Sequence, residues 1–122
     1  MRAGVFGYPA DRSAPMVVRA WLLFNASSPP SAGAEFPTTA IIASGNVAKV
    51  IYNGAGDFTV IFSTPLEVQP LLAAAVKSAA GNIGVAGISN NDTGLLDRKR
   101  ILAQNLANAG TNFSEIHLAF LA

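Results

Sequence analysis

Residues 47–63 read VAKVIYNGAGDFTVIFS, and this stretch decides the fold class. Its centre, residues 53–57 (NGAGD), holds asparagine and glycine, which tolerate the positive φ angles that tight hairpin turns demand. Residues 47–52 before the turn read as a short strand. After the turn, residues 58–63 alternate strictly, with apolar side chains on one face: Phe58, Val60 and Phe62. The stretch therefore predicts a β-hairpin in a β-rich chain.

Further strands are expected on both sides of this hairpin. Residues 17–24 (VVRAWLLF) carry apolar side chains on both faces, which is typical of a strand covered on two sides, so Trp21 is expected in the core. Residues 39–43 and 81–89 read as shorter strands. Residues 113–121 close the chain with a strand in which Ile116, Leu118 and Phe120 alternate with Glu115, His117 and Ala119.

Two segments leave helix and strand open. Residues 65–80 have an alanine-rich centre with good helix propensity, but prolines flank it. In residues 95–109 the leucine spacing favours a helix slightly over a strand, and Gly110 suits the end of such a helix. The whole pattern predicts an all-β chain, an antiparallel β-sandwich or jelly roll of about seven or eight short strands with at most one short helix. Residues 1–16 are expected to form an extended arm, and residues 17–122 the sandwich domain.

The composition restricts the classes of function. Hydrophobic residues make up 51% of the chain and charged residues only 12%, against the usual quarter for a soluble domain. Such a chain exposes apolar surface that a monomer rarely tolerates, so self-association is expected. Basic residues are scattered except at 98–100 (RKR), which reads as a solvated loop, so no nucleic-acid partner is expected. The apolar stretches fall far short of a membrane span, so no membrane partner is expected either.

No group of residues suggests catalysis, a cofactor or a metal. The single histidine, His117, shares a strand face with Glu115, but no nucleophile motif accompanies it. The chain has no cysteine, its carboxylates are spread singly, and its glycines at 81–87 lack the dinucleotide-binding spacing. We therefore expect a non-enzymatic protein without cofactors. The side chains expected to contact another copy or another partner are Phe6, Tyr8, Trp21, Leu23, Ile61 and His117.

Several stretches resemble one viral family. Residues 19–25 (RAWLLFN) are similar to the RAWVNFNG opening common in tail-fibre-type proteins of tailed bacteriophages. Residues 43–47 (ASGNV) and 53–62 (NGAGDFTVIF) resemble the run ASGNVSSITDNGTGDYTVNF that follows in those proteins. Residues 116–120 (IHLAF) resemble their final strand. The order and spacing agree over residues 18–63.

The rest of the chain departs from that family. Residues 65–110 show no match, and residues 25–38 insert Ser-Pro-Pro and Phe36 where the family has a short glycine turn. The resemblance implies a compact β-sandwich on the outside of a virion, usually trimeric and without chemistry of its own. No functional residue carries over, because the shared motifs are strands and a turn.

Two virion roles and one other role are compatible with these expectations. A short arm with no fibre shaft ahead of the sandwich favours a capsid decoration (cement) protein, which stabilises the shell as a homotrimer bound to the major capsid protein. The first alternative is a tail-fibre or tail-tip component, bound to tail proteins, that attaches to a host receptor. Either role places the chain on the virion surface. The second alternative is a carbohydrate-binding β-sandwich module that presents Trp21 and other aromatics to a host-surface glycan.

Overall fold

The computed structural model describes residues 16–89 and 94–122. Phe6 and Tyr8, and all of the expected arm except Met16, lie outside the described residues. The described residues form one short 3-10 helix, η2 (Thr38–Ala40), and the following strands: β1 (Val18–Phe24), β2 (Ile41–Gly45), β3 (Val47–Gly54), β4 (Asp57–Phe62), β5 (Leu71–Lys77), β6 (Gly84–Ile88), β7 (Arg98–Asn105) and β8 (Glu115–Leu121).

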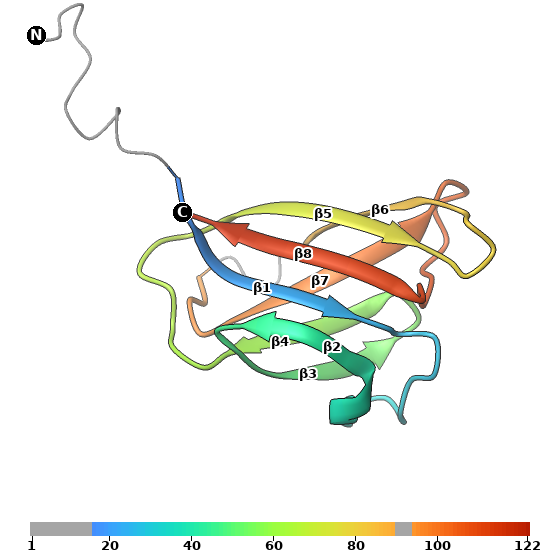
Figure 1. Ribbon diagram of the computed structural model, residues 1–122, viewed down its shortest axis with the longest axis horizontal. Coiled ribbons are helices and arrows are strands. Elements are labelled where there is room, and N and C mark those ends of the chain that lie inside the picture. Colours follow the sequence, from blue (N-terminus) through green and yellow to red (C-terminus); the bar gives the residue numbers. More distant parts are fainter. Residues whose placement is uncertain (1–15, 90–93) are drawn as a thin grey trace, which may run out of the picture.

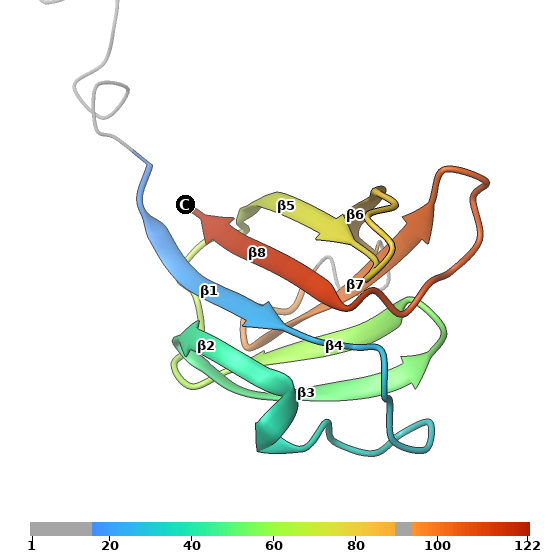
Figure 2. The ribbon, with the colours of Figure 1, turned by 45° about the vertical axis from the view of Figure 1, so that its right-hand side comes forward.

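These strands form two antiparallel sheets that pack face to face (Figures 1 and 2). Sheet A has the strand order β2-β1-β8-β5, and sheet B has the order β3-β4-β7-β6. Along β1, β4, β7 and β8, buried side chains alternate with more exposed ones, because one face of each sheet meets the other sheet. The predicted all-β sandwich is therefore confirmed.

The hairpin expected at residues 47–63 is formed by β3 and β4, and its turn is tied into the fold. Gly56 adopts a φ of 66°, in the left-handed region that favours glycine. Its N–H donates to Asn112 Oδ1 at 2.9 Å, and its carbonyl accepts from the N–H of Ala103 at 2.7 Å. The turn thus connects β4 to β7 and to the loop before β8, in addition to closing the hairpin.

The slight preference for a helix over residues 95–109 was wrong. Residues 98–105 form β7, which pairs with β4 on one side and with β6 on the other. As a central strand, β7 forms backbone hydrogen bonds with a neighbour on each side. This gain in backbone hydrogen bonding outweighs the helix preference that the leucine spacing indicates. The open segment at 65–80 also resolves as a strand, because residues 71–77 pair with β8 over their whole length.

The interpretation of residues 98–100 as a solvated loop was also wrong. Lys99 lies in the middle of β7 with its side chain on the inner face, where it is only 1% exposed. Its ammonium donates a hydrogen bond to Gln69 Oε1. The flanking Arg98 and Arg100 point to the outer face of sheet B, as strand alternation requires.

The core is centred on phenylalanine rings from both sheets and from one loop. Phe24 of β1 meets Phe58 of β4 edge-to-face at 4.9 Å between ring centroids. It also meets Phe36 at 5.4 Å, and Phe36 comes from the segment inserted at residues 25–38. That segment runs along the outer edge of β3, where the N–H of Phe36 donates to the carbonyl of Val50. The insertion therefore adds a core side chain and covers one sheet edge.

Candidate interaction surface

The outer face of sheet A is apolar and nothing in the described residues covers it. Cross-strand partners project to the same side of a sheet. The register pairs Trp21 with Ala119, Ala119 with Ala73, and Leu71 with Leu121, so these side chains are neighbours on one surface. We call this surface the apolar face; its members are Trp21, Leu23, Leu71, Ala73, Ala75, Ala119 and Leu121.

The expectation that Trp21 is a core residue was wrong. Its side chain is 42% exposed on the apolar face, because β1 is covered on one side only, in contrast to the two-sided cover that its sequence indicates. A Cβ atom on Gly45, the cross-strand neighbour, would lie 2.2 Å from Trp21 Nε1. The indole ring therefore rests on the bare backbone of β2, and the glycine provides the space for it.

A shallow hollow of about 410 Å³ crosses the middle of the apolar face. Trp21 and Leu23 line it from β1, the alanines of residues 73–75 from β5, and His117 and Ala119 from β8. The floor is formed by small side chains, so the surface is broad and has few projecting groups. Such a surface suits another flat apolar surface better than it suits a small polar substrate.

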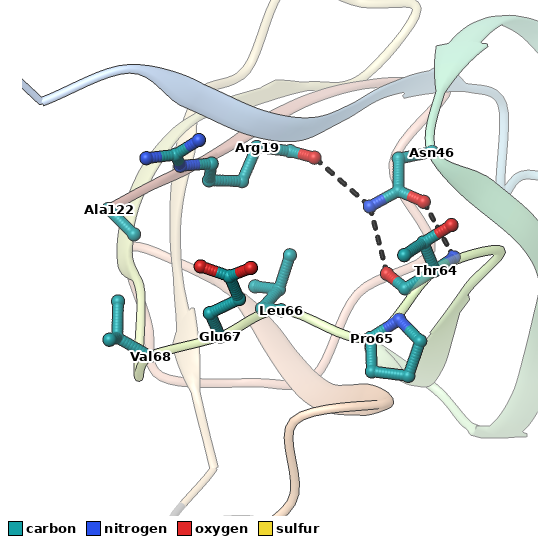
Figure 3. A pocket seen from close by; sticks show the side chains of 8 residues that line it. All are labelled: Arg19, Asn46, Thr64, Pro65, Leu66, Glu67, Val68 and Ala122. Atoms are coloured by element: carbon teal, nitrogen blue, oxygen red, sulfur yellow. Dashed lines mark hydrogen bonds between the residues drawn. The ribbon is translucent and has the colours of Figure 1, made fainter.

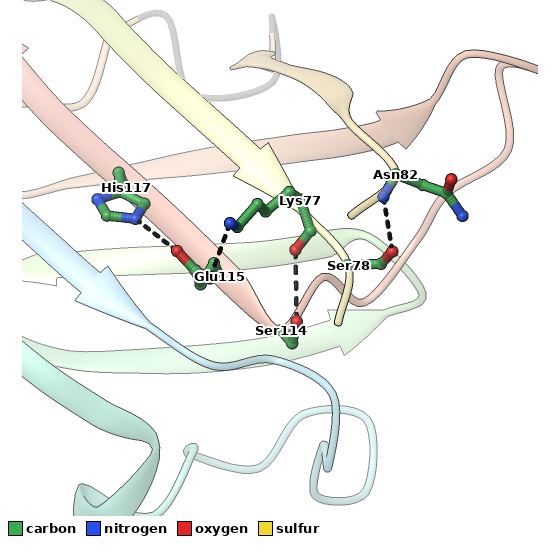
Figure 4. Close-up of polar contacts among 6 residues, drawn as sticks. All are labelled: Lys77, Ser78, Asn82, Ser114, Glu115 and His117. Carbon is green, nitrogen blue, oxygen red and sulfur yellow. Dashed lines mark hydrogen bonds and ion pairs between the residues drawn. The ribbon is translucent and has the colours of Figure 1, made fainter. Parts of the chain in front are cut away.

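A cluster of three charged or polar side chains runs from within this face, where His117 lies between Leu23 and Ala75, to one end of sheet A (Figure 4). Glu115 lies between the other two: its Oε1 is 3.3 Å from His117 Nε2, and its Oε2 is 3.4 Å from Lys77 Nζ. The hydrogen bond with His117 first, and then the charge of Lys77, hold the pKa of Glu115 below its usual value. The hydroxyl of Ser114 donates to the carbonyl of Lys77. Lys77 and Glu115 therefore form a polar rim at one end of the apolar face, and His117 connects this rim to the hollow.

The outer face of sheet B is mixed: it carries charged side chains over β4 and β7, and exposed Val85 and Leu102 over β6 and β7. The guanidinium of Arg100 donates to both carboxylate oxygens of Asp57, with 2.8 Å between Arg100 Nε and Asp57 Oδ1. Asn53 donates to Asp57 Oδ1 and to Thr59 Oγ1. Ile61 lies on this face, where it is paired with Lys49 on one side and with Arg98 on the other. The structure thus brings together three of the expected contact residues, Trp21, Leu23 and His117, and places Ile61 on the opposite side of the molecule.

We expect the Asp57–Arg100 pair to make stability fall in acid. The hydrogen bond from Arg100 is the main cause that lowers the pKa of Asp57, and burial opposes it. A carboxyl group with a lowered folded pKa stabilises the fold above its unfolded pKa, about 3.9, and this contribution disappears as pH falls through the folded pKa. Asp57→Asn should therefore cost stability at pH 7 and progressively less toward pH 2. Urea unfolding over this pH range measures the difference, and a cost independent of pH would contradict the assignment.

A second hollow, of about 280 Å³, lies at the end of the sandwich near the C-terminus (Figure 3). Asn46, with a φ of 57°, turns the chain from β2 to β3 there. Its Nδ2 donates to the carbonyls of Arg19 and Thr64, and its Oδ1 accepts from the N–H of Thr64 at 2.7 Å. These bonds explain Asn46 as a link between β1, the β2–β3 turn and the segment after β4. The sequence signal for this link is the asparagine that follows Gly45.

Comparison of the chain with protein-family models, with curated proteins and with solved structures finds no match. Within residues 16–89 and 94–122, no three histidine, cysteine or acidic side chains are grouped in a way that would hold a metal ion. The same residues contain no helix of the length and apolarity needed to cross a membrane.

Proposed function

We propose that this chain is a non-enzymatic structural subunit of the virion surface of a tailed bacteriophage, and that it associates with copies of itself through the apolar face. The observation that carries the proposal is the asymmetry of the sandwich. One outer face presents Trp21, leucines and alanines over three strands, while the other combines the Asp57–Arg100 pair and further charges with the smaller apolar patch of Val85 and Leu102. Monomeric proteins rarely leave a contiguous apolar surface in water.

The arrangement of the apolar face supports protein–protein contact. Small alanines at its centre let a second surface approach closely, and Trp21 gives it one large anchor beside them. Interfaces commonly place such an aromatic anchor within an apolar patch and surround it with a polar rim. The Lys77–Glu115–His117 cluster supplies that rim on one side.

The resemblance over residues 18–63 supports the virion setting. In that setting we propose a capsid decoration protein, assembled as a trimer on the major capsid protein, with a tail-fibre or tail-tip component as the alternative. Cryo-electron microscopy of virions that carry the chain tests the choice. Density on the capsid lattice supports decoration, density confined to the tail favours the alternative, and absence from the particle overturns both.

The exposed indole of Trp21 favours one second candidate, a glycan-binding module. Aromatic side chains can stack on the apolar faces of sugar rings, and Glu115 and His117 offer hydrogen-bonding groups at the edge of the same hollow. Binding to a glycan array that is lost in Trp21→Ala would support this candidate. An array without binding removes it.

We expect Trp21→Glu to weaken self-association at least tenfold. The substitution places a charge at the anchor of the apolar face, where burial in an interface would cost its hydration. The fold should tolerate it, because the side chain points outward. Sedimentation velocity over a range of concentrations measures the association. A wild-type chain that stays monomeric up to high micromolar concentration would contradict the proposed contact.

Ile61→Glu is the matched control for this experiment. It introduces the same charge on a strand of the other sheet, where Lys49 and Arg98 are its cross-strand neighbours. We expect its association to equal that of the wild type. An equal loss in both variants would show that added charge acts on association generally, without a role for the apolar face.

A further inference from the structure

A titratable side chain lies inside the surface proposed for self-association. The register of sheet A places His117 of β8 between Leu23 of β1 and Ala75 of β5, in a row of side chains that crosses the apolar face. His117 lines the same hollow as Trp21, and its side chain is 52% exposed. A second copy that covers this hollow therefore covers His117 as well.

Among the described residues, the charged groups that face His117 are Glu115 and Lys77 (Figure 4). Glu115 is on the same face of β8, with its Oε1 3.3 Å from His117 Nε2. Lys77 comes from β5, and its Nζ is 3.4 Å from the other oxygen of that carboxylate. The side chains that face His117 from β1 and from the segment before β6 are apolar. Arg19, the only charge of β1, stands four residues before Leu23, about 13 Å along the strand.

The net charge of this cluster depends on the protonation of His117. The hydrogen bond with His117 first, and then the charge of Lys77, keep the pKa of Glu115 below its usual value, so this carboxylate stays ionised in mild acid. The ammonium of Lys77 already balances the single negative charge of Glu115. A protonated His117 therefore adds one positive charge that the cluster does not balance. Burial of such a charge in an interface costs free energy, whereas a neutral imidazole is buried far more readily.

We propose that protonation of His117 weakens the contact between copies at the apolar face, so that the chain associates at neutral pH and dissociates in mild acid. This inference rests on the self-association proposed above and adds its regulation. Histidine is the side chain whose charge ordinarily changes between pH 5 and 8, and the chain contains only one. The contact favours neutral His117, so association releases a proton and acid opposes it.

Sedimentation velocity of the full chain at about pH 7 and about pH 5.5 tests the proposal. The dissociation constant of the wild type should rise about tenfold or more in acid, because each copy brings a protonated ring to the contact. In His117→Gln, whose amide does not titrate, the constant should be the same at both pH values. A wild type that associates equally at both contradicts this inference alone. A wild type that is monomeric at both contradicts the self-association on which it rests.

Lys77→Met tests the charge balance by a separate route. Without the ammonium, the charge of Glu115 balances that of protonated His117, so the cluster becomes neutral in acid and negative at neutral pH. Acid should then strengthen association in this variant, which is the reverse of the wild-type response. The matched control is Lys49→Met, which removes an exposed lysine from β3 of the other sheet and should keep the wild-type response. Acid weakening that persists unchanged in Lys77→Met would overturn the proposal.

Discussion

Replacing Phe24 with alanine should destabilise the sandwich by about 3–5 kcal/mol, which is a large share of the stability of a domain of this size. Phe24 is completely buried and packs edge-to-face on Phe58 of the opposite sheet and on Phe36 of the inserted segment. Its removal leaves a cavity where three parts of the chain meet. The substitution also removes the contact between β1 and the segment that covers β3, because Phe24 and Phe36 no longer pack together.

Urea unfolding monitored by circular dichroism measures this loss. Val18→Ala is the matched control, since it lies on the same strand with half of its surface exposed and should change stability by roughly 0.5 kcal/mol or less. Phe36→Ala should approach the cost of Phe24→Ala, although Phe36 comes from a loop. A cost below about 1 kcal/mol for Phe24→Ala would mean that the aromatic cluster does not hold the two sheets together.

Gly56→Ala should be the second most damaging substitution, at roughly 2–5 kcal/mol. Its φ of 66° disfavours any residue with a Cβ atom. In addition, that Cβ would lie 2.1 Å from the carbonyl oxygen of Ala103 and 2.4 Å from the amide nitrogen of Thr111. These atoms belong to backbone, so the turn has to move away from β7 to make room. The hydrogen bonds of Gly56 with Asn112 and Ala103 would then be lost or lengthened.

Gly87→Ala is the control for Gly56→Ala. Gly87 lies in β6, and a Cβ there would have nothing within 4 Å. This substitution should be neutral or slightly stabilising, because alanine restricts the unfolded chain more than glycine does. Thermal unfolding of the two variants gives the comparison. Equal melting temperatures would show that the β3–β4 turn can rearrange to accept a Cβ atom. The close packing of Gly56 against the backbone of Ala103 and Thr111 would then not matter for stability.

The sequence was sufficient wherever a strand is apolar on one face and polar on the other. The alternation in residues 58–63 placed Phe58, Val60 and Phe62 in the core. The turn expected at 53–57 separates the two strands but is shorter than expected, because β3 continues to Gly54 and β4 begins at Asp57. The alternation in the last strand likewise placed Ile116, Leu118 and Phe120 inside, with His117 outside next to Glu115. A period of two is a local property of the chain, so local reasoning recovers it.

Prediction was wrong where the environment on each side of a strand determines the outcome. The leucines of residues 95–109 fit a helix, and nothing local shows that β4 and β6 stand on either side to pair with Arg98–Asn105. Lys99 is buried for the same reason, since Gln69 reaches it only after the chain has folded. The candidate interaction surface was recovered in part: Trp21, Leu23 and His117 share one face, while Ile61 lies on the other sheet.

The apolar composition and the alternating strands by themselves determined that this chain is a β-sandwich with more apolar surface than one core can bury. Only the tertiary structure decided which surface remains uncovered. Strand β1 is apolar on both faces, so its sequence cannot distinguish the face that meets sheet B from the face that carries Trp21. That choice depends on the register with β2 and β8, which is a property of strands far apart in the chain.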